Sequence, residues 1–481
     1  IAQSAEMEVV GYFDDSPALI GSVLDGNRIH APKDMAMVVQ RLRADEILLA
    51  LPSVPRARRV EIIAEARRAD ARIRTLPGLM DITHGRVEMA HIRNLEIEDL
   101  LGRESVEPDL ELMRRAISDK IVLVTGAGGS IGSELCRQLL ALQPSLLLLD
   151  EISEFGLYEI NRELLARSGE MPVAVPIVPL LGSVCDEGRM QEVIGTWRPD
   201  IIFHAAAYKH VPLVEHNPAE AVRTNVFGTL TLASVAARCG VPNFVLVSTD
   251  KAVRPTNVMG ATKRAAELVL QALNDASSTT RFMIVRFGNV LGTSGSVVPL
   301  FRQQIRDGGP VTLTDRRITR YFMTVPEAAE LVIQAGAMAR GGEVFVLDMG
   351  QPVRILELAR NMIELAGLTI WEPGNPTGDI EIREIGLRPG EKLHEELLID
   401  GDPEPTAHPR ILKADETFLP IDLLRLKLDR IAGLLAAEDR PALVAALNDL
   451  VPEFESRSGI VDWVHLESRA RVISRPVTKI A

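Results

Sequence analysis

Residues 121–132 decide the fold, because the apolar run Ile121-Val-Leu-Val-Thr125 leads directly into Gly126-Ala-Gly-Gly-Ser-Ile-Gly132. The amphipathic stretch from Ser133 to Leu142 then predicts a helix. Glycines suit a turn that bends sharply and approaches a pyrophosphate without a Cβ, while the helix N-terminus offers free N–H groups to the phosphates. The sequence therefore predicts an α/β, Rossmann-like unit with a dinucleotide site. The expected contacts are Gly126, Gly129, Ser130, Ile131 and Gly132.

The next predicted strand, Leu146 to Leu149, ends in Asp150, which favours NAD as the cofactor. A carboxylate at this point accepts hydrogen bonds from the adenosine ribose hydroxyls, and its charge repels the 2′-phosphate of NADP. Residues 200–207 predict the fourth strand of the sheet. Its small residue Ala205 is expected to let the cofactor lie close to the backbone.

The length of 481 residues predicts about three domains at roughly 150 residues each. Short apolar strands at residues 8–13, 46–51 and 72–76 alternate with helical patterns, which predicts a parallel sheet in the first domain. This domain lacks a glycine-rich turn, so we expect its first strand to precede Ile1. The predicted divisions are 1–103 for a truncated Rossmann-like domain, 104–290 for the NAD-binding Rossmann domain, 291–455 for a smaller substrate-binding region with helices at 421–450, and 456–481 for a tail without an assigned function.

Composition argues against several classes of protein. Asp and Glu number 66 against 53 Lys and Arg, and this net charge of -13 argues against binding nucleic acid through bulk positive charge. The three cysteines stand at neither metal-ligand nor Cys-x-x-Cys spacing, so we expect no metal site and a reducing compartment. No apolar run approaches the roughly 18 residues of a membrane-spanning helix. We expect a soluble chain that meets a membrane only through segments outside it.

Asp250 and Lys251 follow the predicted strand 244–248 in the run Ser248-Thr-Asp-Lys251. Active-site groups of open α/β sheets gather at the carboxyl ends of parallel strands. An acid and an amine beside a nicotinamide can protonate a leaving oxygen and remove a carbon-bound proton. Two proton-transfer groups in addition to hydride transfer predict an elimination.

The spacing of Gly126, Gly129 and Gly132 resembles that of the extended short-chain dehydrogenase/reductase superfamily. Where that superfamily usually has Tyr-x-x-x-Lys, this sequence reads Met259-Gly-Ala-Thr-Lys263. The resemblance implies that Lys263 holds the nicotinamide ribose, but no phenol stands at position 259 to accept a proton.

Longer motifs resemble the long, membrane-associated bacterial UDP-N-acetylglucosamine 4,6-dehydratases of polysaccharide biosynthesis. They are Tyr208-Lys-His-Val-Pro-Leu-Val-Glu215, the Ser248 to Lys251 run with Met259, Arg286-Phe-Gly-Asn-Val-Leu-Gly292, Gly295-Ser-Val-Val-Pro299, Ile318-Thr-Arg-Tyr-Phe-Met-Thr324 and Leu387-Arg-Pro-Gly-Glu-Lys-Leu393. The resemblance extends from the first domain to about Glu453. It implies oxidation of the sugar at C4 by bound NAD, loss of water across C5 and C6, and return of the hydride to C6.

By matching position, the resemblance implies that Lys251 is the base at C5, Asp250 the acid at O6 and Thr249 a contact to the C4 oxygen. A lysine base needs a lowered pKa, through burial or cations such as Lys263, and Asp250 needs a raised one. Adjacent Asp and Lys shift each other the opposite way, so reversed roles or a coupled pair stay open. Because a thioether at 259 accepts no proton, we also expect Asp250, directly or through Thr249 or water, to take part at C4.

For the UDP-sugar, Arg320 and Arg388 are candidates to bind the diphosphate, since arginine suits bidentate phosphate contacts. The other candidates are Asn289 for a phosphate or sugar oxygen, Ser296 and Val297 for backbone contacts to the base, and Glu391 with Arg388 for the uridine ribose and phosphate. The family resemblance also implies self-association, and a place at the cytoplasmic face of the inner membrane for the full-length protein.

Two other functions fit part of the sequence. A UDP-sugar 4-epimerase on the same fold needs oxidation and reduction at C4 alone, so the Asp250–Lys251 pair would be superfluous. A noncatalytic NAD-binding regulatory module explains the glycines and Met259 but not the downstream arginine, asparagine and glutamate residues.

Overall fold

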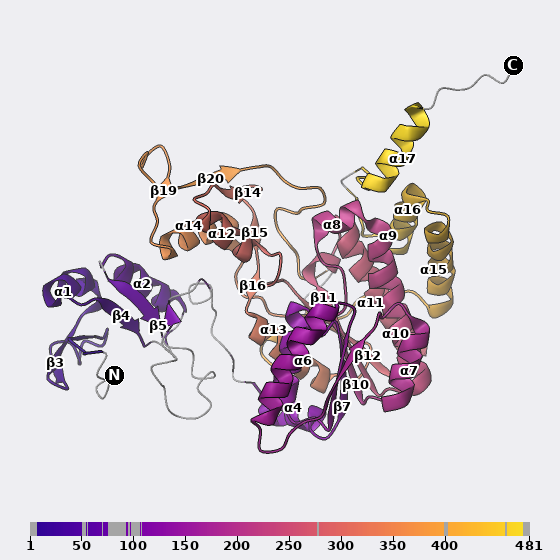
Figure 1. The fold of residues 1–481 in the computed structure, drawn as a ribbon, viewed down its shortest axis with the longest axis horizontal. Coiled ribbons are helices and arrows are strands. Elements are labelled where there is room, and N and C mark those ends of the chain that lie inside the picture. Colours follow the sequence, from indigo (N-terminus) through magenta and orange to yellow (C-terminus); the bar gives the residue numbers. More distant parts are fainter. Residues whose placement is uncertain are drawn as a thin grey trace. The chain divides into compact units, whose positions relative to one another are not determined.

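The computed structural model describes residues 7–50, 54, 56–69, 71–75, 93–94, 97, 106, 108–276, 279–398, 403–456 and 459–474. The chain divides into two compact units (Figure 1). The first comprises Ile1–Ser105 with Asn361–Thr369, and the second comprises Val106–Arg360 with Ile370–Ala481.

The first unit contains a parallel strand pair joined by a helix. Strand β4 (Glu46–Leu49) pairs in parallel with β5 (Arg72–Thr75), and helix α2 (Arg56–Arg67) connects them. Strand β6 (Arg93–Asn94) lies antiparallel to β5. The strands predicted at 46–51 and 72–76 are therefore confirmed, although residues 51 and 76 lie outside the described part of the chain.

A second small sheet of the first unit departs from the prediction. Strand β3 (Asn27–His30) pairs in parallel with β1 (Tyr12–Phe13) and antiparallel with β2 (Val23–Leu24). Helix α1 (Met35–Leu42) follows. Of the strand predicted over 8–13, only the last two residues pair, because β3 is in register with Tyr12 and Phe13 alone.

The second unit is built on a nine-stranded sheet with the order β21-β22-β17-β12-β11-β10-β7-β8-β9. Its parallel strands are β7 (Ile121–Thr125), β8 (Leu146–Glu151), β9 (Ile177–Leu181), β10 (Ile201–His204), β11 (Asn243–Thr249), β12 (Arg281–Phe287) and β17 (Val344–Leu347), with β22 (Ile411–Ala414) and β21 (Glu404–Pro405) antiparallel at one edge. From β9 to β12 this is the doubly wound Rossmann order, with β7 central and the strand order reversing between β7 and β10. The predicted α/β, Rossmann-like class is confirmed.

Two apolar clusters cover the two faces of this sheet. Adjacent strand residues point to opposite faces, so Val122 belongs to one cluster and Leu123 to the other. On one face pack α4 (Leu110–Ile117), α5 (Ser130–Ala141), α6 (Glu154–Gly169) and α13 (Val325–Met338). On the other pack α7 (Glu187–Trp197), α10 (Thr229–Cys239), α11 (Val258–Ala276), α15 (Ile421–Ala436) and α16 (Arg440–Leu450). Figure 1 shows α4 and α6 on one side of the strands and α7, α10 and α11 on the other.

Short strands and helices build a smaller region beside the carboxyl ends of the main strands. The paired strands are β13 (Asn289–Val290) with β16 (Phe322–Met323), β15 (Thr319–Arg320) with β18 (Val353–Arg354), and β14 (Val311–Leu313) with β20 (Ile380–Glu384) and β19 (Ile370–Trp371). Helices in this part of the chain are α12 (Val297–Arg306) and α14 (Ile355–Leu365). Among the described residues, the other helices are α8 (Val211–His216), α9 (Pro218–Ala221), the π-helix η4 (Val222–Gly228), α17 (Trp463–Ser474) and the short 3₁₀ helices η1 (Pro32–Asp34) and η5 (Asp250–Ala252).

Two predicted boundaries are wrong in detail. Helix α5 begins at Ser130, not Ser133, because the chain turns into the helix immediately after Gly129. Strand β10 ends at His204, where the backbone leaves the sheet before Ala205. Helices α15 and α16 confirm the helical pattern at 421–450. In the part of the chain that the structure describes, no helix combines the length and apolarity needed to cross a membrane.

Candidate active site

The turn between β7 and α5 leaves no room for side chains. Gly126 has a φ of +71°, and a Cβ there would lie 2.7 Å from the backbone nitrogen of Ala206. A Cβ on Gly132 would overlap the carbonyl oxygen of Gly126. Helix α5 therefore starts against the end of β7, with the amides of its first turn at Ser130 and Ile131. This geometry fits a pyrophosphate.

Asp150 lies at the end of β8 and is 1% exposed. Its Oδ1 has no hydrogen-bond partner among the described residues. Burial, together with the charge of Glu151, raises the pKa of Asp150 to about 7. The neighbouring Glu151 instead accepts a hydrogen bond of 2.9 Å from the amide of Gly128. A buried acceptor without a donor fits a ribose hydroxyl at this point.

A cavity of about 780 Å³ lies over the carboxyl ends of β7, β10 and β11 and extends into the smaller region. Fourteen of the predicted site residues line it: Gly129, Ser130, Ile131, Gly132, Ala205, Thr249, Lys251, Lys263, Asn289, Ser296, Val297, Arg320, Arg388 and Glu391. Three others, Gly126, Asp150 and Asp250, do not line it. Cofactor, catalytic and substrate candidates thus meet in one cavity.

Asp250 and Lys251 form a buried pair directly after β11. The Lys251 ammonium donates hydrogen bonds to Asp250 Oδ1 at 3.0 Å and to Asn289 Oδ1 at 2.9 Å. The hydroxyl of Thr249 also donates to Asp250 Oδ1, at 2.9 Å. Asp250 is fully buried, and its Oδ2 has no partner in the described chain. Because Asp250 itself does not line the cavity, its route to a bound sugar runs through Thr249 or Lys251.

The charge state of Lys251 differs from the expectation for a base. Burial alone lowers the pKa of Lys251, but the carboxylates of Asp250 and Glu395 outweigh burial, and the pKa is raised above its ordinary value. Lys263 does not offset them, because its ammonium faces another way and donates to the carbonyl of Val247 at 2.7 Å. This is the opposite of the lowering that a lysine base needs, and it agrees with the expectation that an adjacent Asp and Lys shift each other in this direction.

Met259 and Lys263 lie one turn apart on α11 and both line the cavity. Met259 is 2% exposed, and its side chain belongs to the apolar cluster under the cavity. Burial lowers the pKa of Lys263 to about 8, although Glu267 opposes this shift. Lys263 therefore places an amine at the predicted nicotinamide end of the cavity. Met259 places an apolar side chain where related enzymes usually have a tyrosine.

A buried ion cluster fixes β11 against α11 and β12. Glu267 accepts hydrogen bonds from the Ser248 hydroxyl at 2.6 Å and from Arg286 Nε at 2.7 Å. Arg264 and Arg286 both also pair with Glu416. Since a broken buried pair leaves an uncompensated charge, this cluster holds the strand that carries Asp250 and Lys251 in a fixed position.

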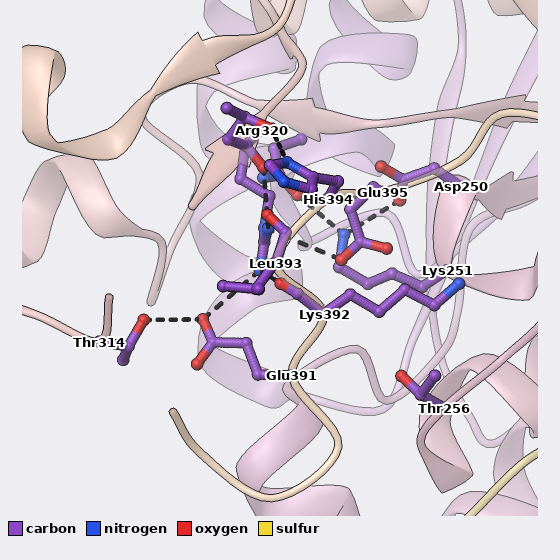
Figure 2. A network of polar contacts seen from close by, with 12 residues as sticks. Asp250, Lys251, Thr256, Thr314, Arg320, Glu391, Lys392, Leu393, His394 and Glu395 are labelled. Atoms are coloured by element: carbon purple, nitrogen blue, oxygen red, sulfur yellow. Dashed lines mark hydrogen bonds and ion pairs between the residues drawn. The ribbon is translucent and has the colours of Figure 1, made fainter. Parts of the chain in front are cut away.

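At the predicted nucleotide end, the two arginines have different surroundings. Arg320 donates to the carbonyls of Thr319, Lys392 and Leu393 at 2.8 to 3.2 Å, so most of its N–H groups already have acceptors (Figure 2). The Arg388 side chain is exposed and makes no hydrogen bond or ion pair within the described residues. Arg388 is therefore the freer of the two to meet a diphosphate.

Glu391 links the chain around Arg388 to Thr314, which follows β14. It accepts hydrogen bonds from the Thr314 hydroxyl at 3.2 Å and from the amide of Arg388 at 3.2 Å. Ser296 precedes α12, and its buried hydroxyl has no partner among the described residues. Both residues line the cavity, and the amide of Ser294, two residues before Ser296, donates to the Ser130 hydroxyl at 3.3 Å, which brings this segment to the start of α5.

Sequence reasoning missed three residues of the site. Lys209 lines the cavity, and burial followed by the charge of Lys251 lowers its pKa. Asn225 holds the Lys209 segment in place by bonding both backbone groups of Tyr208, at 2.8 and 2.9 Å. Glu395 is a buried carboxylate that faces Lys251. Lys209 lies within a quoted motif, but no spacing rule indicates Asn225 or Glu395.

The described residues contain no group of three or more His, Cys, Asp and Glu that is arranged to hold a metal ion. The polar groups around the cavity are instead suited to proton transfer and to a phosphate-bearing ligand.

Comparison with known proteins shows the family of this chain. The family described as "Polysaccharide biosynthesis protein" matches residues 122–416. The capsular polysaccharide biosynthesis protein CapD of Staphylococcus aureus is 48% identical over 366 residues, which are 76% of this chain and 59% of the relative. This chain spans about three fifths of the length of such curated relatives.

Relatives with two different activities in their names match at similar identity. The inverting UDP-N-acetylglucosamine 4,6-dehydratase of Campylobacter jejuni is 31% identical over 290 residues, which are 59% of this chain and 78% of the relative. The UDP-glucose 4-epimerase of Rickettsia akari is 32% identical over 288 residues, which are 59% of this chain and 79% of the relative. Identity alone therefore does not choose between dehydration and epimerisation.

Among solved structures, the X-ray structure of Pen from Bacillus thuringiensis is similar to this chain. The TM-score is 0.54 at 32% sequence identity, and the match covers 65% of this chain and 98% of that chain. The family match lies over the main sheet and the smaller region beside it, from residue 122 to residue 416.

Proposed function

The chain belongs to the polysaccharide biosynthesis protein family, and from this premise we propose that it is an NAD-dependent 4,6-dehydratase of UDP-N-acetylglucosamine or a close UDP-hexosamine. The product would be a UDP-4-keto-6-deoxy sugar. We also propose that the protein self-associates. In its full-length form it would act at the cytoplasmic face of the bacterial inner membrane.

One observation supports dehydration over epimerisation, namely the hydrogen-bonded Asp250–Lys251 pair. Lys251 opens into the cavity between the glycine turn and the predicted UDP end. An epimerase needs a single proton acceptor at C4, whereas elimination needs a base at C5 and an acid at O6. The pair supplies both. The lack of a phenol at position 259 does not separate the two reactions, because each begins with oxidation at C4.

The residues around the cofactor site fit NAD. The amides of Ser130 and Ile131 would hold the pyrophosphate, Asp150 the adenosine ribose and Lys263 the nicotinamide ribose. Bound NAD would supply hydride transfer, taking the hydride from C4 and later returning it to C6. Oxidation at C4 makes the C5 proton acidic, and the protein then has to move protons only.

The resting ion pair becomes an acid and a base when one proton moves. As the C4 hydroxyl is oxidised, the Asp250 carboxylate would take its proton through the hydroxyl of Thr249. In the elimination, Asp250 would give this proton to O6 and Lys251 would pass a proton to Asp250 along their 3.0 Å hydrogen bond, so that an N–H bond breaks and an O–H bond forms. The neutral amine would take the C5 proton as the C6–O bond breaks and water leaves. Once the hydride is on C6, Lys251 would return its proton to C5 and Asp250 would protonate Lys251 again. This coupled transfer accounts for a lysine whose pKa is raised before the substrate binds.

Product analysis after incubation with UDP-N-acetylglucosamine tests the proposal. We expect a product lighter by one water, whereas an isomer of equal mass would indicate an epimerase and an unchanged sugar a noncatalytic NAD-binding module. Lys251→Ala should lower the rate by about 10² to 10⁴-fold while NAD still binds. Lys413→Ala, at a lysine on β22 whose side chain is 43% exposed, is the matched control. It should change neither the rate nor the binding of NAD.

A further inference from the structure

Glu395 is a buried acid that the proposed reaction does not use. Its side chain is only 4% exposed, and it does not line the cavity. One carboxylate oxygen, Oε1, lies 3.8 Å from Arg320 Nε, and the other, Oε2, has no hydrogen-bond partner in the described chain. Figure 2 shows Glu395 on the Asp250 and Lys251 side of the network, away from Thr314 and Glu391. Burying an ionised carboxylate without hydrogen-bond partners costs folding free energy unless nearby charges compensate it.

The segment before Glu395 is held from two sides, which fixes where this carboxylate lies. Arg320 on β15 bonds the carbonyls of Lys392 and Leu393. On the other side, the Lys392 ammonium donates to the carbonyl of Val253 at 3.0 Å, just after Lys251 in the chain. Thr256 and Asn257 both donate to the carbonyl of Gly390 at 3.0 Å. Glu395 therefore has little freedom to move away from Lys251.

Four charged groups act on Glu395, and their balance couples it to the proposed base. Burial raises the pKa of Glu395, and the charge of Asp250 raises it further, while Lys251, Arg320 and Lys392 oppose the rise. In return, Glu395 is one of the two carboxylates that raise the pKa of Lys251. The carboxyl and the ammonium thus depend on each other across the wall of the cavity.

We propose that Glu395 is a positioning residue for Lys251: from outside the cavity, its carboxylate holds the charge on the ammonium and sets the pH range in which Lys251 can accept a proton. With Glu395 ionised, Lys251 keeps its proton. Once Glu395 is protonated, only Asp250 supports the ammonium, and transfer of the proton to Asp250 becomes easier. The catalytic role of Glu395 rests on the proposed function. The charge coupling between Glu395 and Lys251 does not, because it exists with or without a bound sugar.

Competitive labelling with acetic anhydride over a range of pH tests the coupling without any turnover. Lys251 is reachable by a small reagent because it lines the cavity. In Glu395→Gln, the midpoint of Lys251 labelling should fall by about 1 pH unit or more, since a nearby opposite charge shifts a pKa by about 1 to 3 units. Glu395→Asp keeps the charge, so its midpoint of Lys251 labelling should stay close to that of the parent protein. Glu404→Gln removes a 68% exposed carboxylate on β21 that pairs with Lys413, and it should leave the Lys251 labelling midpoint unchanged.

Lys263 serves as an internal reference, because Glu395 is not among the groups that shift its pKa. An unchanged Lys251 midpoint in Glu395→Gln would overturn the proposal. So would an equal fall in Glu395→Gln and Glu395→Asp, because that result would indicate a merely structural role.

Turnover provides the second measurement. The acid limb of kcat against pH should move to lower pH in Glu395→Gln, with the KM for UDP-N-acetylglucosamine unchanged, because Glu395 does not touch the nucleotide. A tenfold rise in the KM of Glu395→Gln, with no shift in the acid limb of its kcat profile, would overturn the role assigned to Glu395. If the parent protein forms no dehydrated product, the proposed function fails, while the labelling result still decides whether Glu395 controls Lys251.

Discussion

The ammonium of Lys251 donates a hydrogen bond of 2.9 Å to the side-chain oxygen of Asn289, which joins the end of β11 to β13. The sequence interpretation gave Asn289 a phosphate or sugar oxygen. In the structure the side-chain oxygen of Asn289 accepts from the proposed base, and its amide N–H groups stay the predicted donors to a phosphate or sugar oxygen. Two acceptors, Asp250 and Asn289, therefore set the direction in which the amine points.

Asn289→Ala should lower kcat by about 10- to 10²-fold with little change in KM, because a misplaced base costs rate more than binding. Steady-state kinetics with UDP-N-acetylglucosamine measure both constants. Asn289→Asp keeps an acceptor at this position and should recover part of the rate. A large rise in KM with kcat intact would instead return Asn289 to the phosphate or sugar contact that its sequence position suggested.

Asp150→Asn should narrow the preference for NAD over NADP, since the carboxylate that repels the 2′-phosphate is gone. Titration of the protein with each cofactor measures this preference. Equal affinity of the parent protein for NAD and NADP would contradict the role of Asp150.

The same substitution has a pH-dependent effect on stability. The folded-state pKa of Asp150, about 7, lies above the ordinary carboxyl value, so its stabilising contribution is complete below about pH 4 and is lost as the pH rises through 7. Asp150→Asn avoids this loss, which amounts to about 4 kcal/mol at most. Without NAD, the variant should gain thermal stability over the parent at pH 8.5 and about half as much at pH 5.5, because the loss builds up between about pH 4 and pH 7. An equal Tm difference at both pH values would contradict the raised pKa.

Met259→Leu should keep kcat within about tenfold of the parent, because a thioether passes no proton and leucine fills a similar volume. Met259→Ala should cost about 2 to 5 kcal/mol of stability, since the side chain is buried in the apolar cluster. Turnover and thermal unfolding separate these effects. A loss in Met259→Leu as large as that in Lys251→Ala would show that the sulfur takes part in the reaction.

Asp250→Asn should stop the reaction before the sugar is oxidised. Thr249 lines the cavity and donates to Asp250, so the pair offers a path for the C4 hydroxyl proton that Met259 cannot accept. Rapid mixing with the substrate should then show no absorbance of the reduced cofactor. Clear formation of reduced cofactor in this variant would restrict Asp250 to the elimination step.

The sequence predicts the part of this site that depends on local geometry. A strand followed by Gly126 to Gly132 can form few structures other than a turn into a helix, and the end of β11 places Thr249 to Lys251 at the active-site edge. Charge interactions between distant segments are not predictable in this way. The effect of Asp250 on the pKa of Lys251 follows from their adjacent positions, but the smaller effect of Glu395 does not, because it depends on a distant segment that Arg320 and Lys392 hold in place.

Transfer of a C4 label tests the central claim of 4,6-dehydration most directly. UDP-N-acetylglucosamine with deuterium at C4 should give a product one water lighter, with the deuterium at C6. Mass and proton spectra of the isolated nucleotide sugar report both features. Deuterium retained at C4 in a product of unchanged mass would contradict the account and indicate epimerisation at that carbon.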